Sequence, residues 1–191
     1  VDMGDMFHRA SAFDQPIGGF NTAAVHTMPC MFSMACAFDQ TIGDFNTAAV
    51  SDMRYMFYYA KAFQQPSVNF NTAAVKDMKH MFAHASKFNQ PIGGFNTAAV
   101  TSMMRMFHKA SAFDQPIGNL NTAAVVDMSY MFAYTSAFNQ PIGGWSIDAV
   151  TDMRGMSCKA VSYNHLTLPT IHPCLNTMSA LLFKNKTLAQ P

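Results

Sequence analysis

One unit of 25 residues recurs through most of this chain and limits its fold more than any other feature. The clearest copy reads Phe-Asn-Gln-Pro-Ile-Gly-Gly-Phe-Asn-Thr-Ala-Ala-Val over residues 88–100. Self-similarity at a fixed period of this length is typical of solenoids, in which each repeat forms one coil stacked on the last. We therefore expect a solenoid of about six repeats over residues 1–156 and a separate, off-register tail over residues 157–191.

Apolar residues recur at fixed positions in every copy, at a spacing that suits one side of an α-helix. The third copy shows this set as Val50, Met53, Met56, Phe57, Ala60 and Phe63. The preceding Asn-Thr pair offers a side-chain cap for a first turn. We predict a short helix that ends near the Ala. Its start is open, because it could begin at the first Met and leave Ala-Ala-Val extended.

The rest of each copy predicts a short strand. Pro and the paired Gly exclude a continuing helix, and the alternation of Phe, Gln and Ile favours an extended segment that would pair in parallel with its neighbours about 4.8 Å away. The fold class expected is thus an α/β repeat solenoid, with one short helix and one short parallel strand in each coil. The third copy reads Pro66-Ser67-Val68-Asn69 in place of Pro-Ile-Gly-Gly, which predicts a local irregularity.

Two polar columns are expected to form structural ladders. Alternation places the Gln column on the inward side, where an amide must find backbone partners or the same Gln one coil away. An exposed ladder is the alternative. The Asn column would serve the turn after the strand. The two columns are Gln15, Gln40, Gln65, Gln90, Gln115 and Gln140, and Asn21, Asn46, Asn71, Asn96 and Asn121.

Composition excludes some classes of partner. Half of the residues are hydrophobic, 12% are charged and the net charge is +1. Lys and Arg are not clustered, so we expect no nucleic-acid partner, and no apolar run is long enough to span a membrane. Val1 already lies within a repeat, so we expect the chain to be a fragment whose export signal would lie upstream. The four Cys share no repeat position and give little support to a disulfide framework.

No motif points to catalysis, a cofactor or a metal. His80 and His84 have an i, i+4 spacing that could hold zinc, but no third ligand is evident. One outward column alternates Asp14, Asp39 and Asp114 with amide side chains and could hold calcium only weakly, because no site gains two convergent carboxylates. We expect the protein not to be an enzyme.

The combination Val-x-Asp-Met-x-x-Met-Phe-x-x-Ala-x-x-Phe-x-Gln-Pro-Ile resembles the repeat of BspA-like surface proteins of the Mycoplasma-lipoprotein type, which look like a divergent branch of the leucine-rich-repeat superfamily. The resemblance covers Val1 to about Met156. It implies a right-handed solenoid that is secreted or displayed at a cell surface and used for adhesion or protein contacts. The family carries no catalytic residues to transfer.

The leading functional hypothesis is therefore a non-enzymatic, extracellular or cell-surface module that binds a protein or a glycan. Exposed aromatic residues suit contact surfaces, although they could simply decorate the solvent side. The candidates are Tyr55, Tyr58, Tyr59, Tyr130 and Tyr134. The alternative is a structural solenoid that self-assembles into a fibre or surface layer. A minor alternative is ice binding through the repeated Thr.

The tail has two interpretations. It could be a cap that covers the open end of the solenoid, or it could be non-native, because Val161–Ile171 resembles translated sequencing-adapter sequence. It also holds a glycosylation match at Asn185-Lys186-Thr187.

Overall fold

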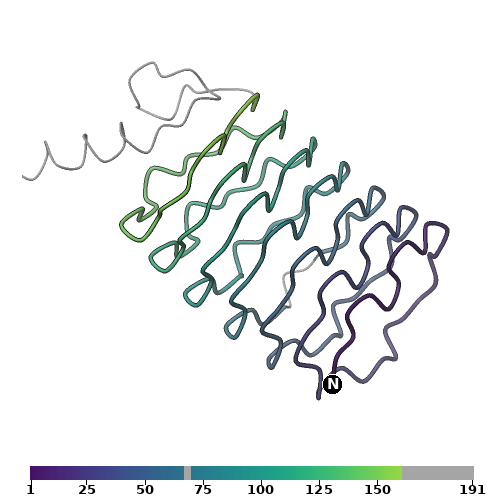
Figure 1. Ribbon diagram of the computed structural model, residues 1–191. Coiled ribbons are helices and arrows are strands. Elements are labelled where there is room, and N and C mark those ends of the chain that lie inside the picture. The colour runs from purple at the N-terminus through teal and green to yellow at the C-terminus, as the bar shows by residue number, and fades with distance from the viewer. Residues whose placement is uncertain (67–69, 161–191) are drawn as a thin grey trace, which may run out of the picture.

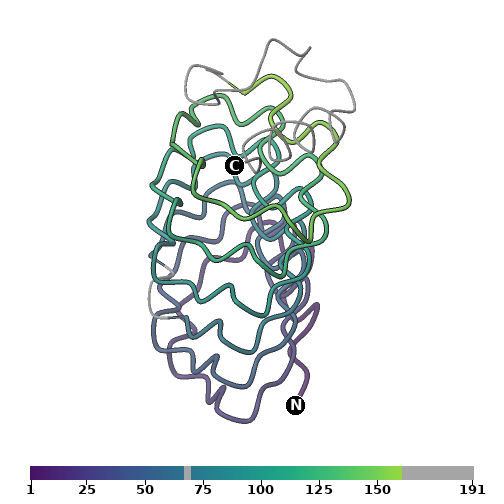
Figure 2. The same cartoon turned by 90° about the vertical axis from the view of Figure 1, so that its left-hand side faces the viewer.

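The computed structural model describes residues 1–66 and 70–160, and in it the chain winds into coils that stack side by side along one axis (Figure 1). Coil 1 spans residues 1–25, each later coil begins 25 residues further on, and coil 7 begins at residue 151. In the view turned by 90°, the same coils rise in order from the N-terminal end of the stack (Figure 2). Neighbours in space are thus residues about one repeat apart in sequence.

The expected helix and strand in each coil are wrong. Within residues 1–66 and 70–160 there is no helix and no extended strand. Regular β-pairing among the described residues is limited to one parallel bridge between each pair of neighbouring coils. The predicted leucine-rich-repeat-like coil of one helix and one strand is therefore not supported. The bridges are Asp2–Thr27, Thr27–Asp52, Asp52–Asp77, Asp77–Ser102, Ser102–Asp127 and Asp127–Asp152.

Hydrogen bonds between coils explain why the helical spacing does not give a helix. In coil 4, the Phe82 amide donates to the Met106 carbonyl of coil 5 at 2.9 Å, whereas the next amide, Ala83, donates to His80 three residues back at 3.1 Å. This alternation continues along the segment. An α-helix would use every amide within its own segment, so it would leave none for the neighbouring coil. The segment forms successive turns instead.

Two residues in each coil take a left-handed backbone conformation, which interrupts any helix before it can extend. In coil 4 they are His80, with φ 57°, and His84, with φ 61°. This region is costly for residues other than Gly, and the inter-coil hydrogen bonds offset the cost. Positions 5 and 9 of every coil behave in this way: Asp5, Arg9, Cys30, Met34, Tyr55, Tyr59, His80, His84, Arg105, Lys109, Tyr130, Tyr134, Gly155 and Lys159.

The recurring Met and Phe residues form one continuous interior through the stack. In coil 3, Met53, Phe57 and Phe63 are fully buried. The Phe57 ring stacks on Phe63 of its own coil at 4.1 Å and on Phe82 of the next coil at 5.5 Å, with planes 5° apart in the second pair. Because each Phe recurs at the same position, two parallel columns of rings run through the stack and bury its apolar surface.

The Gln column joins coils through a partner that the sequence did not indicate. Gln115 Nε2 donates to Asn89 Oδ1 of the preceding coil at 3.0 Å, and the Asp114 amide donates to the same oxygen at 2.9 Å. The acceptor is thus the residue before Gln, one coil earlier. Gln15 is exposed, and the later Gln residues are half-buried. The ladder therefore lies at the edge of the core.

The Asn-Thr pair closes a turn and does not cap a helix. Asn96 Oδ1 accepts a hydrogen bond from the Ala98 amide at 3.1 Å, as in an Asx turn. Thr97 is buried, and its Oγ1 donates to the Asn121 carbonyl of the next coil at 2.8 Å. The repeated Thr hydroxyls therefore face neighbouring coils, and this geometry gives no support to an ice-binding row at the surface.

Some expectations fall on residues outside those that the structure describes. They are the irregularity at Ser67–Asn69 and the adapter-like and glycosylation matches beyond residue 160. The stacking hydrogen bonds continue past Met156, since the Tyr134 amide donates to the Cys158 carbonyl at 2.8 Å. Within the described ranges, the structure contains no helix of the length and apolarity needed to span a membrane.

Candidate functional site

Rings and cations line the turn-rich segments of coils 3 to 7, where His80 is buried and the others are partly or fully exposed. They occupy positions 5, 8, 9 and 11, two of which are the left-handed positions. We call this surface the aromatic face. Its members are Tyr55, Tyr58, Tyr59, Lys61, His80, His84, Arg105, His108, Lys109, Tyr130, Tyr134 and Lys159.

Three of the tyrosines proposed as contact residues come together with two histidines. The Tyr55 ring stacks on His80 of the next coil at 4.5 Å, and Tyr59 stacks on His84 at 4.0 Å. Tyr58 lies between these pairs and meets His80 and His84 edge-on, at 5.8 and 5.7 Å. These histidines are not among the residues predicted to make contacts, although the 25-residue register places His80 in the column of Tyr55.

Cations lie over the other two proposed tyrosines. The Arg105 guanidinium lies 5.0 Å from the centre of the Tyr130 ring. Lys109 and Lys159, from the coils before and after, approach the Tyr134 ring at 5.5 and 5.1 Å. These are cation–π distances, at which a ring and a cation stabilise each other.

His108 connects the two groups into one surface. Its ring meets His84 at 5.4 Å and Tyr134 at 5.7 Å, both edge-on. The structure thus brings all five proposed tyrosines onto a single continuous face. Tyr134 is the most exposed of them, at 41%.

The three histidines of the aromatic face are neutral at pH 7. Burial first, and nearby positive charge that includes Arg105 second, lower the pKa of His80, His84 and His108 from 6.5 to about 4. No group of three His, Cys, Asp or Glu side chains within the described ranges is arranged to hold a metal ion. His80 and His84 stack on tyrosine rings, which gives them a structural role in the face.

The cations of the aromatic face are not neutralised by neighbours. Among the described residues, Lys61, Arg105 and Lys109 form no ion pair, whereas Arg54, outside the face, lies 2.7 Å from the Asp52 carboxylate. Positions 5, 8, 9 and 11 of coils 3 to 7 carry no carboxylate. The face therefore combines rings with uncompensated positive charge.

The acidic column considered for calcium makes hydrogen bonds between coils. Asp14 Oδ1 accepts from the Asp39 amide at 2.9 Å and from Gln40 Nε2 at 2.9 Å. These two donors, the amide first, hold the pKa of the Asp14 carboxyl below its usual range. The column acts as an acceptor ladder that does not depend on charge, because Asn89 fills the same role in coil 4.

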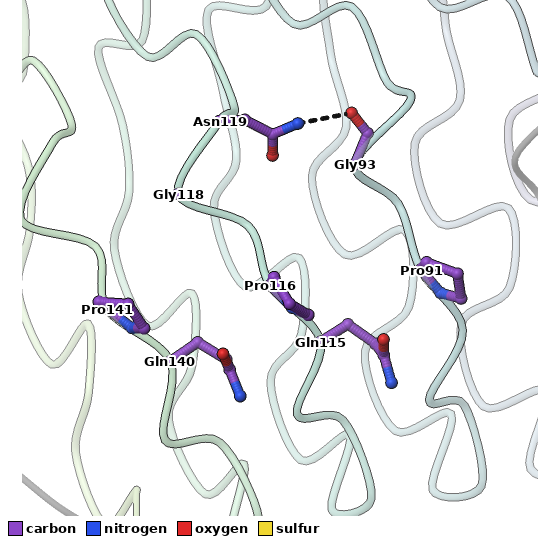
Figure 3. A pocket seen from close by; sticks show the side chains of 8 residues that line it. All are labelled: Pro91, Gly93, Gln115, Pro116, Gly118, Asn119, Gln140 and Pro141. Atoms are coloured by element: carbon purple, nitrogen blue, oxygen red, sulfur yellow. Dashed lines mark hydrogen bonds between the residues drawn. The ribbon is translucent and has the colours of Figure 1, made fainter.

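A second surface feature is a shallow groove of about 570 Å³ across coils 4 to 6. Figure 3 shows its proline and glutamine side chains repeating from one coil to the next, with Asn119 Nδ2 donating to the Gly93 carbonyl at 2.8 Å. The lining residues are Pro91, Gly93, Gln115, Pro116, Gly118, Asn119, Gln140 and Pro141. None of these side chains is an acid, a base or a nucleophile.

The chain is similar to one family of known proteins. A model of the family described as "Mycoplasma protein of unknown function, DUF285" matches residues 1–91 and again residues 65–169. No curated protein and no solved structure matches the chain.

Proposed function

Since this chain belongs to the DUF285 family of Mycoplasma proteins, whose function is unknown, we propose that it is a non-enzymatic binding module that presents the aromatic face to a protein or glycan partner at a cell surface. The resemblance of its repeat to BspA-like surface proteins supports the location. The single observation that carries the proposal is the continuity of rings and unpaired cations over coils 3 to 7.

The physical character of the aromatic face supports a role in binding. Tyr and Arg are enriched among the residues that dominate binding energies. The stacking of Tyr55 and Tyr59 on histidines already restricts these side chains. The entropy cost of ordering their rings therefore falls on folding, and binding a partner loses less entropy. Half-buried rings with free polar edges can contact both apolar and polar groups.

The arrangement of side chains favours binding over catalysis. A nucleophile needs a base within hydrogen-bond reach, and an acid–base pair needs groups that titrate near the working pH. The histidines of the aromatic face have pKa values of about 4 and make ring contacts. The groove in coils 4 to 6 is lined by Pro, Gly, Gln and Asn.

The proposal is tested by removing rings and measuring binding to an array of immobilised glycans and a panel of purified cell-surface proteins. The variant Tyr55→Ser, Tyr58→Ser, Tyr59→Ser should lose at least about tenfold in affinity for any partner found, as expected for central aromatic contacts. Val126→Ser is the matched control, because Val126 is 41% exposed and lies outside the face. Equal binding by wild type and the triple variant would refute the contact role.

A further inference from the structure

We propose that Arg105 and the histidines beside it form a binding site for a doubly charged tetrahedral oxyanion, the chemistry of inorganic phosphate or of a phosphate monoester carried by a partner. This inference rests on the proposed binding function of the aromatic face and names a group that the face would recognise. Its basis is a cluster of hydrogen-bond donors that finds no acceptor in the described part of the chain.

Arg105 is the centre of this cluster. Its side chain is half-buried, and it makes no hydrogen bond or ion pair with any described residue. The guanidinium lies 5.0 Å from the centre of the Tyr130 ring, a contact that uses the face of the group and leaves its in-plane N–H donors free. The Nε atom is buried without a partner. A buried donor without an acceptor costs free energy, so the arrangement favours a ligand that supplies oxygens.

Two histidines adjoin Arg105. The His80 amide donates to the Met104 carbonyl at 2.9 Å, and the His108 amide donates to the Arg105 carbonyl at 3.1 Å. His80 is 6% exposed, and the Nδ1 atoms of His80 and His108 are both buried without a hydrogen-bond partner. A neutral imidazole can carry its N–H on either nitrogen, so each ring can donate one hydrogen bond to an oxyanion.

The charges around these two histidines are all positive. After burial, the pKa of His80 is lowered by Arg105, the other histidines and Lys79, and the pKa of His108 by His84, Arg105 and Lys109. No carboxylate acts on either ring. Positions 4 to 12 of coils 2 to 7 contain no Asp or Glu, so the described part of this surface offers Arg105 no anion.

Coil 1 places an acid where coil 5 places the arginine. Its residues at positions 5 and 8 are Asp5 and His8, and the Asp5 carboxylate lies 3.9 Å from His8 Nδ1. Coil 5 carries Arg105 and His108 at the same two positions. The negative charge that coil 1 supplies from its own chain would come from a ligand in coil 5.

The number of charges favours a doubly charged tetrahedral group over a carboxylate. Arg105, Lys79 and Lys109 contribute three positive charges around the histidines, whereas a carboxylate brings one negative charge and two oxygens. A phosphate monoester brings about two negative charges and three acceptor oxygens, which match the planar fork of Arg and leave an oxygen for an imidazole. A phosphodiester carries only one charge, so nucleic acid suits the site less well.

Isothermal titration calorimetry of the whole chain with small anions tests the inference, at constant ionic strength and about pH 7.5, where phosphate is mostly doubly charged. The probes are inorganic phosphate, inorganic sulfate, glucose 6-phosphate and acetate. We expect phosphate and sulfate to bind at one site at least about tenfold more tightly than acetate, because they carry two charges on a tetrahedral group. No saturable binding of either dianion, or equal binding of acetate, would overturn the inference.

Glucose 6-phosphate separates the two sources of the group. An affinity within about threefold of that of inorganic phosphate supports the site and assigns it to an ester carried by a partner. An affinity at least about tenfold weaker supports the site and assigns it to the free ion.

Arg105→Gln should weaken phosphate binding at least about tenfold, because it removes the charge and the bidentate donors. Arg9→Gln is the matched control. Arg9 is also an arginine in a left-handed conformation, with φ 61° against 53° for Arg105, and it is exposed in coil 1 outside the aromatic face. It should leave the phosphate affinity unchanged. Equal losses in the two variants would reduce the effect to general charge and overturn the inference.

Two milder variants keep the test decisive if Arg105→Gln unfolds, which its urea midpoint would show. Arg105→Lys keeps the charge and loses the fork, so phosphate binding should weaken about threefold to tenfold. His108→Phe keeps the ring and removes one donor, so binding should weaken about threefold to fivefold. Wild-type affinity in both variants would contradict the site.

Failure of the inference and failure of the proposed function give different results. If neither dianion binds, and the triple tyrosine variant loses a glycan or protein partner, the inference fails and the proposed function stands. If phosphate binds through Arg105, and the triple tyrosine variant keeps every partner, the anion site stands and the contact role of the tyrosines fails.

Discussion

The ring of Phe82 in coil 4 lies over Phe107 of coil 5, with centroids 5.8 Å apart and planes within 7° of parallel. Both rings are fully buried. The contact arises because two identical residues occupy the same position of successive coils. Each inner coil therefore packs its rings against those of the coil before it and the coil after it. A deletion in one coil should therefore be felt by the coils on both sides.

Phe82→Ala should lower the free energy of unfolding by about 3–5 kcal/mol, because it removes a fully buried ring and leaves a cavity between two neighbours. Phe7→Ala is the matched control in coil 1, where the ring is only partly buried and has a coil on one side. It should cost clearly less. Urea denaturation followed by circular dichroism measures both, and equal losses would contradict the stacking account.

Thr97→Val tests the hydrogen bonds between coils. The buried Thr97 Oγ1 donates to the Asn121 carbonyl at 2.8 Å. Val keeps the shape but leaves that carbonyl without this donor, so we expect a loss of about 1–3 kcal/mol. Thr101→Val is the control, because Thr101 is exposed and water can replace its bond to the Lys76 carbonyl. Similar unfolding midpoints for the two variants would argue against a role for the buried hydroxyl.

The sequence predicted which residues are buried but not the local structure that buries them. The spacing of Met53, Phe57 and Phe63 identified the core correctly, because a chain of successive turns also advances about three residues between inward positions. The left-handed conformation of Tyr55 and Tyr59 carries no sequence signal, since Gly is the usual residue there. Hydrogen bonds to residues one repeat away are also invisible to a local helical pattern.

The candidate site could be predicted in part. The sequence predicts Tyr58 and Tyr134 as exposed contact residues, and the structure joins them through His84 and His108. The i, i+4 spacing of His80 and His84 predicts two neighbours on one helix, but the structure has no helix there and stacks each histidine on a tyrosine of the preceding coil.

Gly155→Ala should disturb the aromatic face. Gly155 occupies a left-handed position, with φ 58°, and an added Cβ would lie 2.5 Å from the Tyr130 ring. The ring must move, at a cost of about 1–3 kcal/mol. The cost should be smaller in a Tyr130→Ala background. Gly144→Ala is the control, because nothing lies within 4 Å of the added carbon. Thermal unfolding of the four variants checks this, and a neutral Gly155→Ala would contradict it.

Asp114→Asn and Asp114→Ala separate hydrogen bonding from charge. Asp114 Oδ1 accepts from the Asn139 amide at 2.8 Å and from Gln140 Nε2 at 2.9 Å. Asn keeps an acceptor, so we expect little change, whereas Ala should cost about 1–2 kcal/mol. Calcium should not alter the unfolding midpoint of either variant or of wild type. A calcium-dependent rise in the wild-type midpoint, lost in Asp114→Asn, would show a cation site in this column.

The pH dependence of stability should reveal the histidines of the aromatic face. The pKa of His80, His84 and His108 is about 4 in the folded protein, below the ordinary value of 6.5, because burial disfavours the charged imidazole. As the pH falls from about 6.5 to about 4, the unfolded chain takes up protons that the folded chain does not, so folding stability decreases across this window.

Replacing these three histidines by Phe keeps the rings and removes the titration, so the urea midpoint of the triple variant should vary less than that of wild type between about pH 6.5 and pH 4. His26→Phe, at an exposed site outside the face, is the control and should keep the wild-type slope. The Asp2, Asp14 and Asp152 carboxyls have pKa values below the usual 3.8. The stability they contribute is lost below that value, so they do not mask the histidine window. A wild-type midpoint that stays constant across it would show that the three imidazoles are charged without cost in the folded protein.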